Sequence, residues 1–154
     1  APTLEGNALI KVRDAHRLSQ LPTIADDTGL EVDCLGGAPG VYSARYAGEA
    51  HNDAANRQKL VEDLRSFSPP YKARFRTVVA YIDAAGAEHL FEGCVEGTII
   101  LEERGEAGFG YDALFVPEGE ERTFAQMTEH EKNAMSHRAR AIAAFSQYLK
   151  QYPL

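Results

Sequence analysis

The sequence has 154 residues, a length that predicts one domain. Hydrophobic residues make up 44% and charged residues 25%, which is enough apolar material for a core without disulfide support. The formal net charge of −7 argues against a protein that binds duplex DNA, since such a protein needs broad phosphate neutralisation. A nucleotide enzyme remains compatible with it, because a few local cations and a metal suffice there.

No apolar run is long enough to span a membrane, and no signal peptide is visible. The spacing of the two cysteines, Cys34 and Cys94, matches no zinc site. We therefore expect reduced thiols and a cytoplasmic protein that binds no membrane.

Along the chain, the first predicted element is a helix from Thr3 to Gln20, where apolar residues recur at helical spacing and Thr3 is the cap. The apolar run 23–25 predicts a short buried strand that ends at Asp26-Asp27-Thr28-Gly29. Alternating apolar residues predict a second strand over 30–35. We expect a turn after it at Gly36–Gly40.

The rest of the chain predicts alternating helices and strands. These are a helix over 52–67, strands over 73–83, 88–94, 95–103 and 114–116, a capping box at 128–131, and a helix over 136–148. A turn at Ala84–Ala87 folds one strand back on the next, so the sheet cannot be purely parallel. The pattern predicts one α/β domain with a mixed central sheet flanked by helices.

Two adjacent carboxylates, Asp26 and Asp27, follow a predicted strand just before a glycine. A strand end is a rigid mount at the rim of a sheet, where α/β enzymes bind ligands. Carboxylates there can bind Mg²⁺, which prefers hard oxygen ligands, and one of them can accept a proton from an attacking water. A solvated Asp-Thr-Gly turn also explains these residues, so the motif alone leaves both interpretations open.

Lysine and aromatic residues provide further candidate contacts. Asn7 and Lys11 share one helix face, which suits a phosphate, although a lysine on a helix is often only solvated. In Gly108-Phe109-Gly110-Tyr111-Asp112, two glycines let the backbone approach a ligand, and the Phe109 ring can stack on a purine. A turn with a core aromatic residue is the alternative.

The segment before the last predicted helix carries donors. Lys132 and Ser136 share a face if the helix is continuous, and His137 and Arg138 lie near a helix start, where backbone N–H groups point outward. These groups suit a phosphate or a carbonyl on a base. A capped helix with surface charges is the simpler interpretation of the segment alone.

The order of these motifs resembles the inosine triphosphate pyrophosphatase family, which cuts ITP, dITP and XTP to a monophosphate and pyrophosphate. The segments that carry the resemblance are Thr3–Lys11, Ala25–Leu30, Leu35–Tyr46, Gly108–Asp112 and Ser136–Arg138. The resemblance implies an elongated mixed sheet flanked by helices, two lobes with a cleft, a homodimer, Mg²⁺ as cofactor and a purine nucleoside triphosphate as substrate.

Matched by motif, Asp27 resembles the proton acceptor and metal ligand of the family, with Asp26 as a second metal ligand. Substrate contacts are implied for Lys11, Thr28, Phe109, Gly110, Tyr111, Asp112, Lys132, His137 and Arg138. Together these residues predict a single ligand held by acidic, cationic and aromatic side chains from distant parts of the sequence.

The sequence departs from the family before Thr3. Members begin with a strand and a Thr/Ser-x-Asn-x-x-Lys loop that grips the triphosphate, and they carry a metal-binding Glu shortly afterwards; neither has a counterpart here. We therefore expect residues 1–154 to form one N-terminally incomplete domain of this kind. Two alternatives stay open: a nucleotide-binding module with impaired catalysis, and a hydrolase of another phosphorylated metabolite.

Overall fold

The computed structural model describes residues 1–153, and these residues form two compact units. Unit 1 consists of residues 1–28, 76–94 and 136–153, and unit 2 consists of residues 29–75 and 95–135. No helix within residues 1–153 is both long and apolar enough to cross a bilayer.

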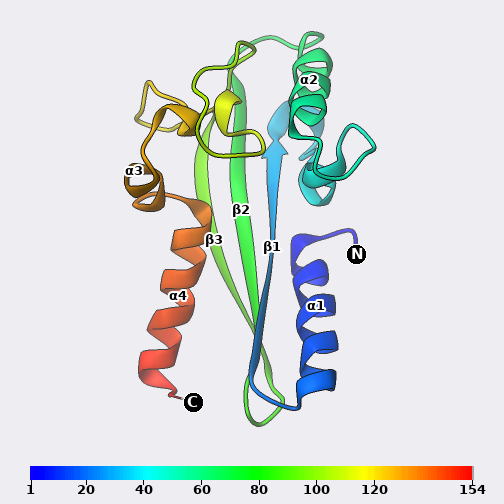
Figure 1. The fold of residues 1–154 in the computed structure, drawn as a ribbon, viewed down its shortest axis with the longest axis vertical. Helices are drawn as coiled ribbons and strands as arrows, with labels where there is room; N and C mark the ends of the chain where they lie inside the picture. Colours follow the sequence, from blue (N-terminus) through cyan, green and yellow to red (C-terminus); the bar gives the residue numbers. More distant parts are fainter. Residues whose placement is uncertain (154) are drawn as a thin grey trace. The chain divides into compact units, whose positions relative to one another are not determined.

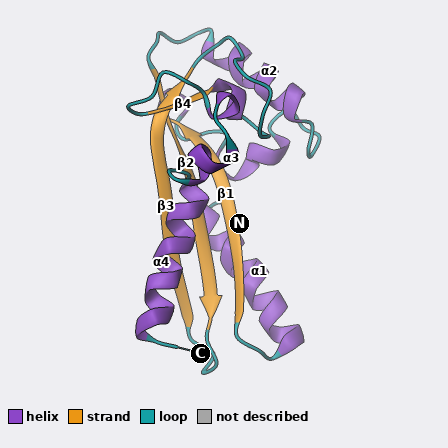
Figure 2. Ribbon diagram, turned by 60° about the vertical axis from the view of Figure 1, so that its left-hand side comes forward, coloured by secondary structure: helices purple, strands orange, loops and turns teal. Residues whose placement is uncertain are grey.

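Four strands form one sheet in the order β1-β2-β3-β4 (Figure 1). Their bounds are β1 Thr23–Val32, β2 Tyr71–Ile82, β3 Glu88–Ile99 and β4 Phe115–Pro117. Each described strand runs antiparallel to its neighbours (Figure 2). Gly97 of β3 pairs with Pro117 of β4. The expected α/β class with a helix-flanked sheet is confirmed. These strands include no parallel pair, because β2 and β3 form a hairpin and β1 and β4 each run opposite to the strand beside them.

Two long helices belong to unit 1, α1 (Leu4–Ser19) and α4 (His137–Gln151). The Thr3 side chain accepts a hydrogen bond from Gly6 N at the start of α1, and the Ser136 side chain accepts one from Ala139 N at the start of α4. Each cap satisfies an N–H group that has no partner within its helix.

The two helices cover opposite faces of the unit 1 sheet. Arg76 of β2 contacts Glu5 of α1, whereas Tyr81 of β2 packs on Phe145 of α4. An even and an odd position on one strand point to opposite faces. Gly93 of β3 lets α4 approach closely, because a Cβ atom there would lie 2.0 Å from the carbonyl oxygen of His137.

Unit 2 contains the main apolar core and the shorter helices. The rings of Phe75, Phe115 and Phe124 pack together, with centroid distances between 4.6 and 6.0 Å. Leu60 and Leu64 bring helix α2 onto this core. The remaining elements are η1 Asp33–Leu35, η2 Gly40–Arg45, α2 Asp53–Leu64, η3 Asp112–Leu114, η4 Phe124–Gln126 and α3 Glu129–Asn133.

Most predicted elements are confirmed, including the capping box at the start of α3. The predicted strand break at 26–29 is wrong, because β1 continues from Thr23 to Val32. Within it, the Thr28 hydroxyl lies 2.8 Å from the hydroxyl of Thr77, which is fully buried on β2. Pairing with a neighbouring strand therefore overrides the local turn preference of Asp-Thr-Gly. The strands predicted over 88–94 and 95–103 form one continuous strand, β3, which ends at Ile99.

Candidate functional site

The first cluster of predicted site residues lies in unit 1, where α1 meets β1. Lys11 Nζ donates hydrogen bonds to Asp27 Oδ1 at 3.0 Å and to the backbone oxygen of Asp26 at 2.9 Å. The Lys11 side chain is 53% exposed and the Asp27 side chain 18% exposed. The cation is thus open to solvent, while the carboxylate is held by the helix and the strand.

A second pair lies on the other face of the same strand. Arg138, in the first turn of α4, places Nη2 3.5 Å from both Asp26 Oδ2 and Thr28 Oγ1. Arg138 and Asp26 are both substantially exposed. His137 begins α4 beside them, where its backbone packs on Gly93.

Strand alternation explains why the adjacent carboxylates part. Asp27 points to the α1 face with Lys11, whereas Asp26 and Thr28 point to the α4 face with Arg138. The sequence places Asp26 and Asp27 next to each other, but the strand gives them different neighbours. Asp27 therefore shares its face of the strand with Lys11, and Asp26 does not.

The second cluster lies in unit 2, in the loop that contains Phe109. Lys132 Nζ of α3 lies 2.6 Å from Asp112 Oδ2, and both residues are buried. The same ammonium group lies 4.6 Å from the centroid of the Phe109 ring, within range of a cation–π interaction. Phe109 is nevertheless 66% exposed, so much of its apolar surface is available to a ligand.

Gly108 is required for this arrangement. Its φ of +76° lies in the left-handed region, and a Cβ atom there would lie 2.2 Å from Asp112 Oδ2. The same carboxylate oxygen accepts a hydrogen bond from Phe109 N at 3.1 Å. Only glycine lets the loop close over the carboxylate that pairs with Lys132.

Tyr111 anchors the other end of this loop. Its hydroxyl donates to the backbone oxygen of Ser43 at 2.6 Å, and the residue is 4% exposed. Burial raises the pKa of the Tyr111 phenol, with smaller contributions from Tyr46 and Asp53. The neutral phenol therefore persists as a hydrogen-bond donor throughout the ordinary pH range.

A cavity of about 450 Å³ opens beside the loop. Its lining includes Phe109 and Asp112, together with Asp53 and Arg57 of α2 and Glu103. Gly108 and Gly110 also line it. An aromatic face, backbone groups and a few polar side chains around one hollow are typical of a small-molecule site.

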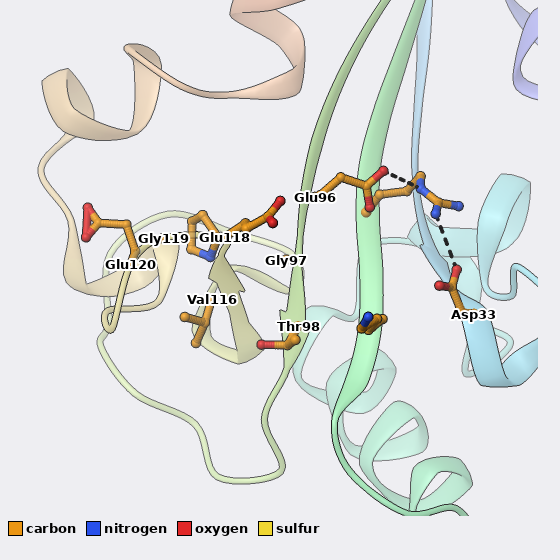
Figure 3. A pocket seen from close by; sticks show the side chains of 11 residues that line it. Asp33, Glu96, Gly97, Thr98, Val116, Glu118, Gly119 and Glu120 are labelled. Carbon is orange, nitrogen blue, oxygen red and sulfur yellow. Dashed lines mark hydrogen bonds and ion pairs between the residues drawn. The ribbon is translucent and has the colours of Figure 1, made fainter.

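A second cavity of about 490 Å³ in unit 2 lies between β2, β3 and the turn after β4 (Figure 3). Arg74 lies within it and pairs with Glu96 at 2.9 Å and Asp33 at 3.5 Å, the two contacts dashed in Figure 3. The hydrogen bond that Arg74 donates to Glu96 is the main cause of the raised pKa of Arg74. Carboxylates already neutralise the Arg74 guanidinium. Its charge is therefore less available to a triphosphate than that of Lys11, which pairs with one carboxylate and is 53% exposed.

The donor set at β1 suits Mg²⁺, which proteins hold through one or two carboxylates while water and substrate phosphates supply the remaining ligands. Asp27 has such a carboxylate, partly shielded from solvent. Asp26 points to the other face of β1, so Asp27 is the better-placed ligand. Within residues 1–153, no three His, Cys, Asp or Glu side chains are grouped to hold a metal without a substrate.

The model of the Ham1 family matches residues 1–148 of this chain. This chain belongs to the Ham1 family. The membership confirms the resemblance that the motifs predict. The predicted site residues are distributed over both units: Lys11, Asp26, Asp27, Thr28, His137 and Arg138 in unit 1, and Phe109, Gly110, Tyr111, Asp112 and Lys132 in unit 2.

Ham1 relatives are similar over nearly the whole chain. A dITP/XTP pyrophosphatase from Porphyromonas gingivalis is 56% identical over 149 residues, which are 97% of this chain and 76% of that protein. One from Chlorobaculum tepidum is 47% identical over 98% of this chain and 74% of its own length. The solved Ham1 protein of Staphylococcus aureus has a TM-score of 0.93 at 38% identity, covering 98% of this chain and 78% of that one.

Sequence reasoning missed Asp53, Arg57 and Ser43, which contact the Phe109 loop. Asp53 and Arg57 are four residues apart, a spacing that predicts a shared helix face. Their common target, Gly110, is more than fifty residues away in the sequence. No local pattern in a single sequence indicates such a distant contact.

Proposed function

We propose that this chain hydrolyses purine nucleoside triphosphates with non-standard bases, of the dITP and XTP class, to the monophosphate and pyrophosphate. The observation that carries the proposal is the Lys11–Asp27 pair at 3.0 Å, a solvent-open cation beside a partly shielded carboxylate. The names of the Ham1 relatives support the substrate class.

Water is the second substrate of the proposed reaction. The water oxygen forms a bond to the α-phosphorus, the bond between that phosphorus and the α,β-bridging oxygen breaks, and pyrophosphate leaves with the electron pair. Asp27 orients the water and accepts its proton. Lys11 stabilises the charge that grows on the phosphate oxygens.

We further propose Mg²⁺ as the cofactor, held by Asp27, with Asp26 as a second predicted ligand. When bound, a divalent cation offsets phosphate charge and lowers the pKa of a coordinated water. A homodimer is a further prediction of the family resemblance. Cytoplasmic location, a single domain and the absence of duplex nucleic acid among the partners are predictions from length, cysteine usage and net charge.

Base selection follows from hydrogen-bond chemistry. Hypoxanthine and xanthine carry an oxygen at C6, which accepts from the donors near His137 and Arg138. Adenine carries an amino group at that position, so a hydrogen-bond donor of the base would face a hydrogen-bond donor of the protein. One buried unsatisfied group costs about 1–3 kcal/mol, and we therefore expect roughly a ten- to hundred-fold preference for dITP over dATP.

The test is pyrophosphate release from dITP, XTP and dATP, with Mg²⁺ and with EDTA, in water enriched in ¹⁸O. We expect release from dITP and XTP with the metal, and the label in the monophosphate. Label in pyrophosphate would contradict attack at the α-phosphorus. Binding of a monophosphate without release from any substrate would favour the nucleotide-binding module, and equal rates on all bases would favour a general phosphohydrolase.

A further inference from the structure

Helix α2 holds Gly110 in the Phe109 loop through both of its backbone groups. Gly110 N donates to Asp53 Oδ2 at 2.9 Å, and Arg57 Nη1 donates to Gly110 O at 2.9 Å. Asp53 and Arg57 lie one helical turn apart, so they present a carboxylate and a guanidinium on one face of α2. Both contacts are partly buried.

These bonds fix consecutive peptide planes around the aromatic ring. The N–H of Phe109 belongs to the plane that follows Gly108, and it donates to Asp112. The N–H of Gly110 belongs to the next plane and donates to Asp53, and the C=O of Gly110 belongs to the plane after that and accepts from Arg57. Since each peptide is rigid, these three bonds hold the planes on both sides of Phe109 and of Gly110, and so restrict the backbone freedom of these two residues.

We propose that Asp53 and Arg57 are positioning residues for purine recognition, which hold the Phe109 ring in the orientation that stacks on the base. This inference rests on the proposed function. Asp53 and Arg57 act through the Gly110 backbone to which they bond. Arg57 is itself held by Glu103, whose Oε1 lies 3.0 Å from Arg57 Nε.

Holding the Phe109 loop in place lowers the entropy that the loop loses when a ligand binds. A loop with glycines on both sides of an aromatic residue loses much conformational entropy when a ligand orders it. A ring that is already held in place avoids part of that loss, so the ligand binds more tightly. We call Asp53 and Arg57 the clamp. Removing either residue should therefore weaken binding of the base and leave the bond-breaking step largely unchanged.

The kinetic test uses Asp53→Ala and Arg57→Ala, each alone and combined with Phe109→Ala. Each single clamp variant should raise the KM for dITP about ten-fold, the scale of one lost hydrogen bond, with kcat changed less than about two-fold. The matched control is Glu62→Ala, an exposed residue of α2 that bonds only within the helix, and it should leave both parameters unchanged.

The combined variants separate positioning from direct contact with substrate. If the clamp acts through the ring, then Asp53→Ala should add less than about two-fold to the KM of Phe109→Ala. Full multiplication of the two effects would overturn the inference. Asp53→Asn keeps an acceptor oxygen for Gly110 N and should recover most of the wild-type KM.

Hydrogen exchange gives a readout that needs no activity. The Gly110 amide should exchange about ten-fold faster in Asp53→Ala than in wild-type protein, and Glu62→Ala should leave it unchanged. Unchanged exchange would refute the clamp itself. If wild-type protein exchanges as expected but releases no pyrophosphate from dITP, the proposed function fails while the clamp stands. If Asp53→Ala does not fold, Arg57→Ala provides the same comparisons in exchange at the Tyr111 amide and in KM.

Discussion

Each unit contains one Lys–Asp pair among its predicted site residues, and the two pairs differ in burial. Lys11–Asp27 in unit 1 is 3.0 Å long, with a lysine that is 53% exposed. Lys132–Asp112 in unit 2 is 2.6 Å long, with side chains that are 10% and 7% exposed. The same two residue types therefore occur in nearly opposite solvent environments.

The difference in burial indicates that the two pairs have different roles. An exposed pair contributes little to stability, commonly less than about 1 kcal/mol, so its groups can exchange partners when a phosphate or metal arrives. A buried pair leaves an uncompensated charge if either member is removed, which costs about 3–5 kcal/mol. We infer that the unit 1 pair serves chemistry and that the unit 2 pair maintains the shape of the base pocket.

The largest expected effect is on catalysis in unit 1. Asp27→Asn removes the proton acceptor while keeping the size of the side chain, so kcat for dITP should fall roughly 10²- to 10⁴-fold, with a free energy of unfolding within about 1 kcal/mol of wild type. Pyrophosphate release and urea denaturation measure the two quantities. Asp14→Asn is the matched control, since Asp14 belongs to an exposed pair within α1. Normal turnover in Asp27→Asn would remove this residue from the mechanism.

The next effect is on stability in unit 2. Lys132→Met leaves the Asp112 carboxylate buried without its cation, so the free energy of unfolding should drop by about 3–5 kcal/mol. Lys59→Met is the control, because the Lys59–Asp63 pair is far more exposed and its loss should cost less than about 1 kcal/mol. Equal losses in the two variants, measured by urea denaturation, would show that burial does not distinguish the pairs.

A smaller effect concerns the ring above the buried lysine. Phe109→Ala should raise the KM for dITP roughly five- to 150-fold, the range that corresponds to about 1–3 kcal/mol of base stacking. Its kcat should change much less, because the ring does not touch the reacting phosphorus in the proposed mechanism. An unchanged KM would rule out stacking on Phe109 and leave the loop with a structural role.

The smallest expected effect is pH-dependent and lies next to Lys132 in the sequence. Glu131 pairs with Arg122 on the surface of unit 2, and this hydrogen bond, followed by one from the Thr128 backbone, lowers the pKa of Glu131 from 4.5 to about 2. A depressed carboxyl pKa stabilises the fold fully above pH 4.5, and the stabilisation disappears as the pH falls to about 2. Melting curves of Glu131→Gln should therefore differ slightly from wild type at pH 7 and converge with it in acid. A constant difference across that range would exclude the pair as its source.

The sequence predicts the elements of both regions well, because local chemistry determines them. Thr3 and Ser136 begin helices as capping residues should, and Thr128 with Glu131 forms the expected capping box. Gly108 also marks a close approach of the backbone, which is to the Asp112 carboxylate. These features depend on a few neighbouring residues, which are visible in one sequence.

Features that depend on distant partners could not be predicted from the sequence alone. Asp26 and Asp27 suggest one acidic site at a strand end, but pairing with β2 extends the strand and turns the two carboxylates to different faces. The buried face of α4 is likewise not evident from hydrophobicity alone, because Ile142 is 43% exposed while Ala141 is fully buried. Which face of a helix meets a sheet depends on the neighbour, and here Gly93 brings that neighbour close.

Gly108 has a practical meaning for redesign of base preference. A methyl group at this position would collide with the carboxylate that neutralises Lys132, so even alanine there would disturb the charge balance of the pocket. At Gly110 a methyl group would meet no atom within 4 Å, and asparagine tolerates its left-handed backbone best among side-chain-bearing residues. A mutant library aimed at new nucleotides should therefore leave position 108 untouched and limit position 110 to glycine and asparagine.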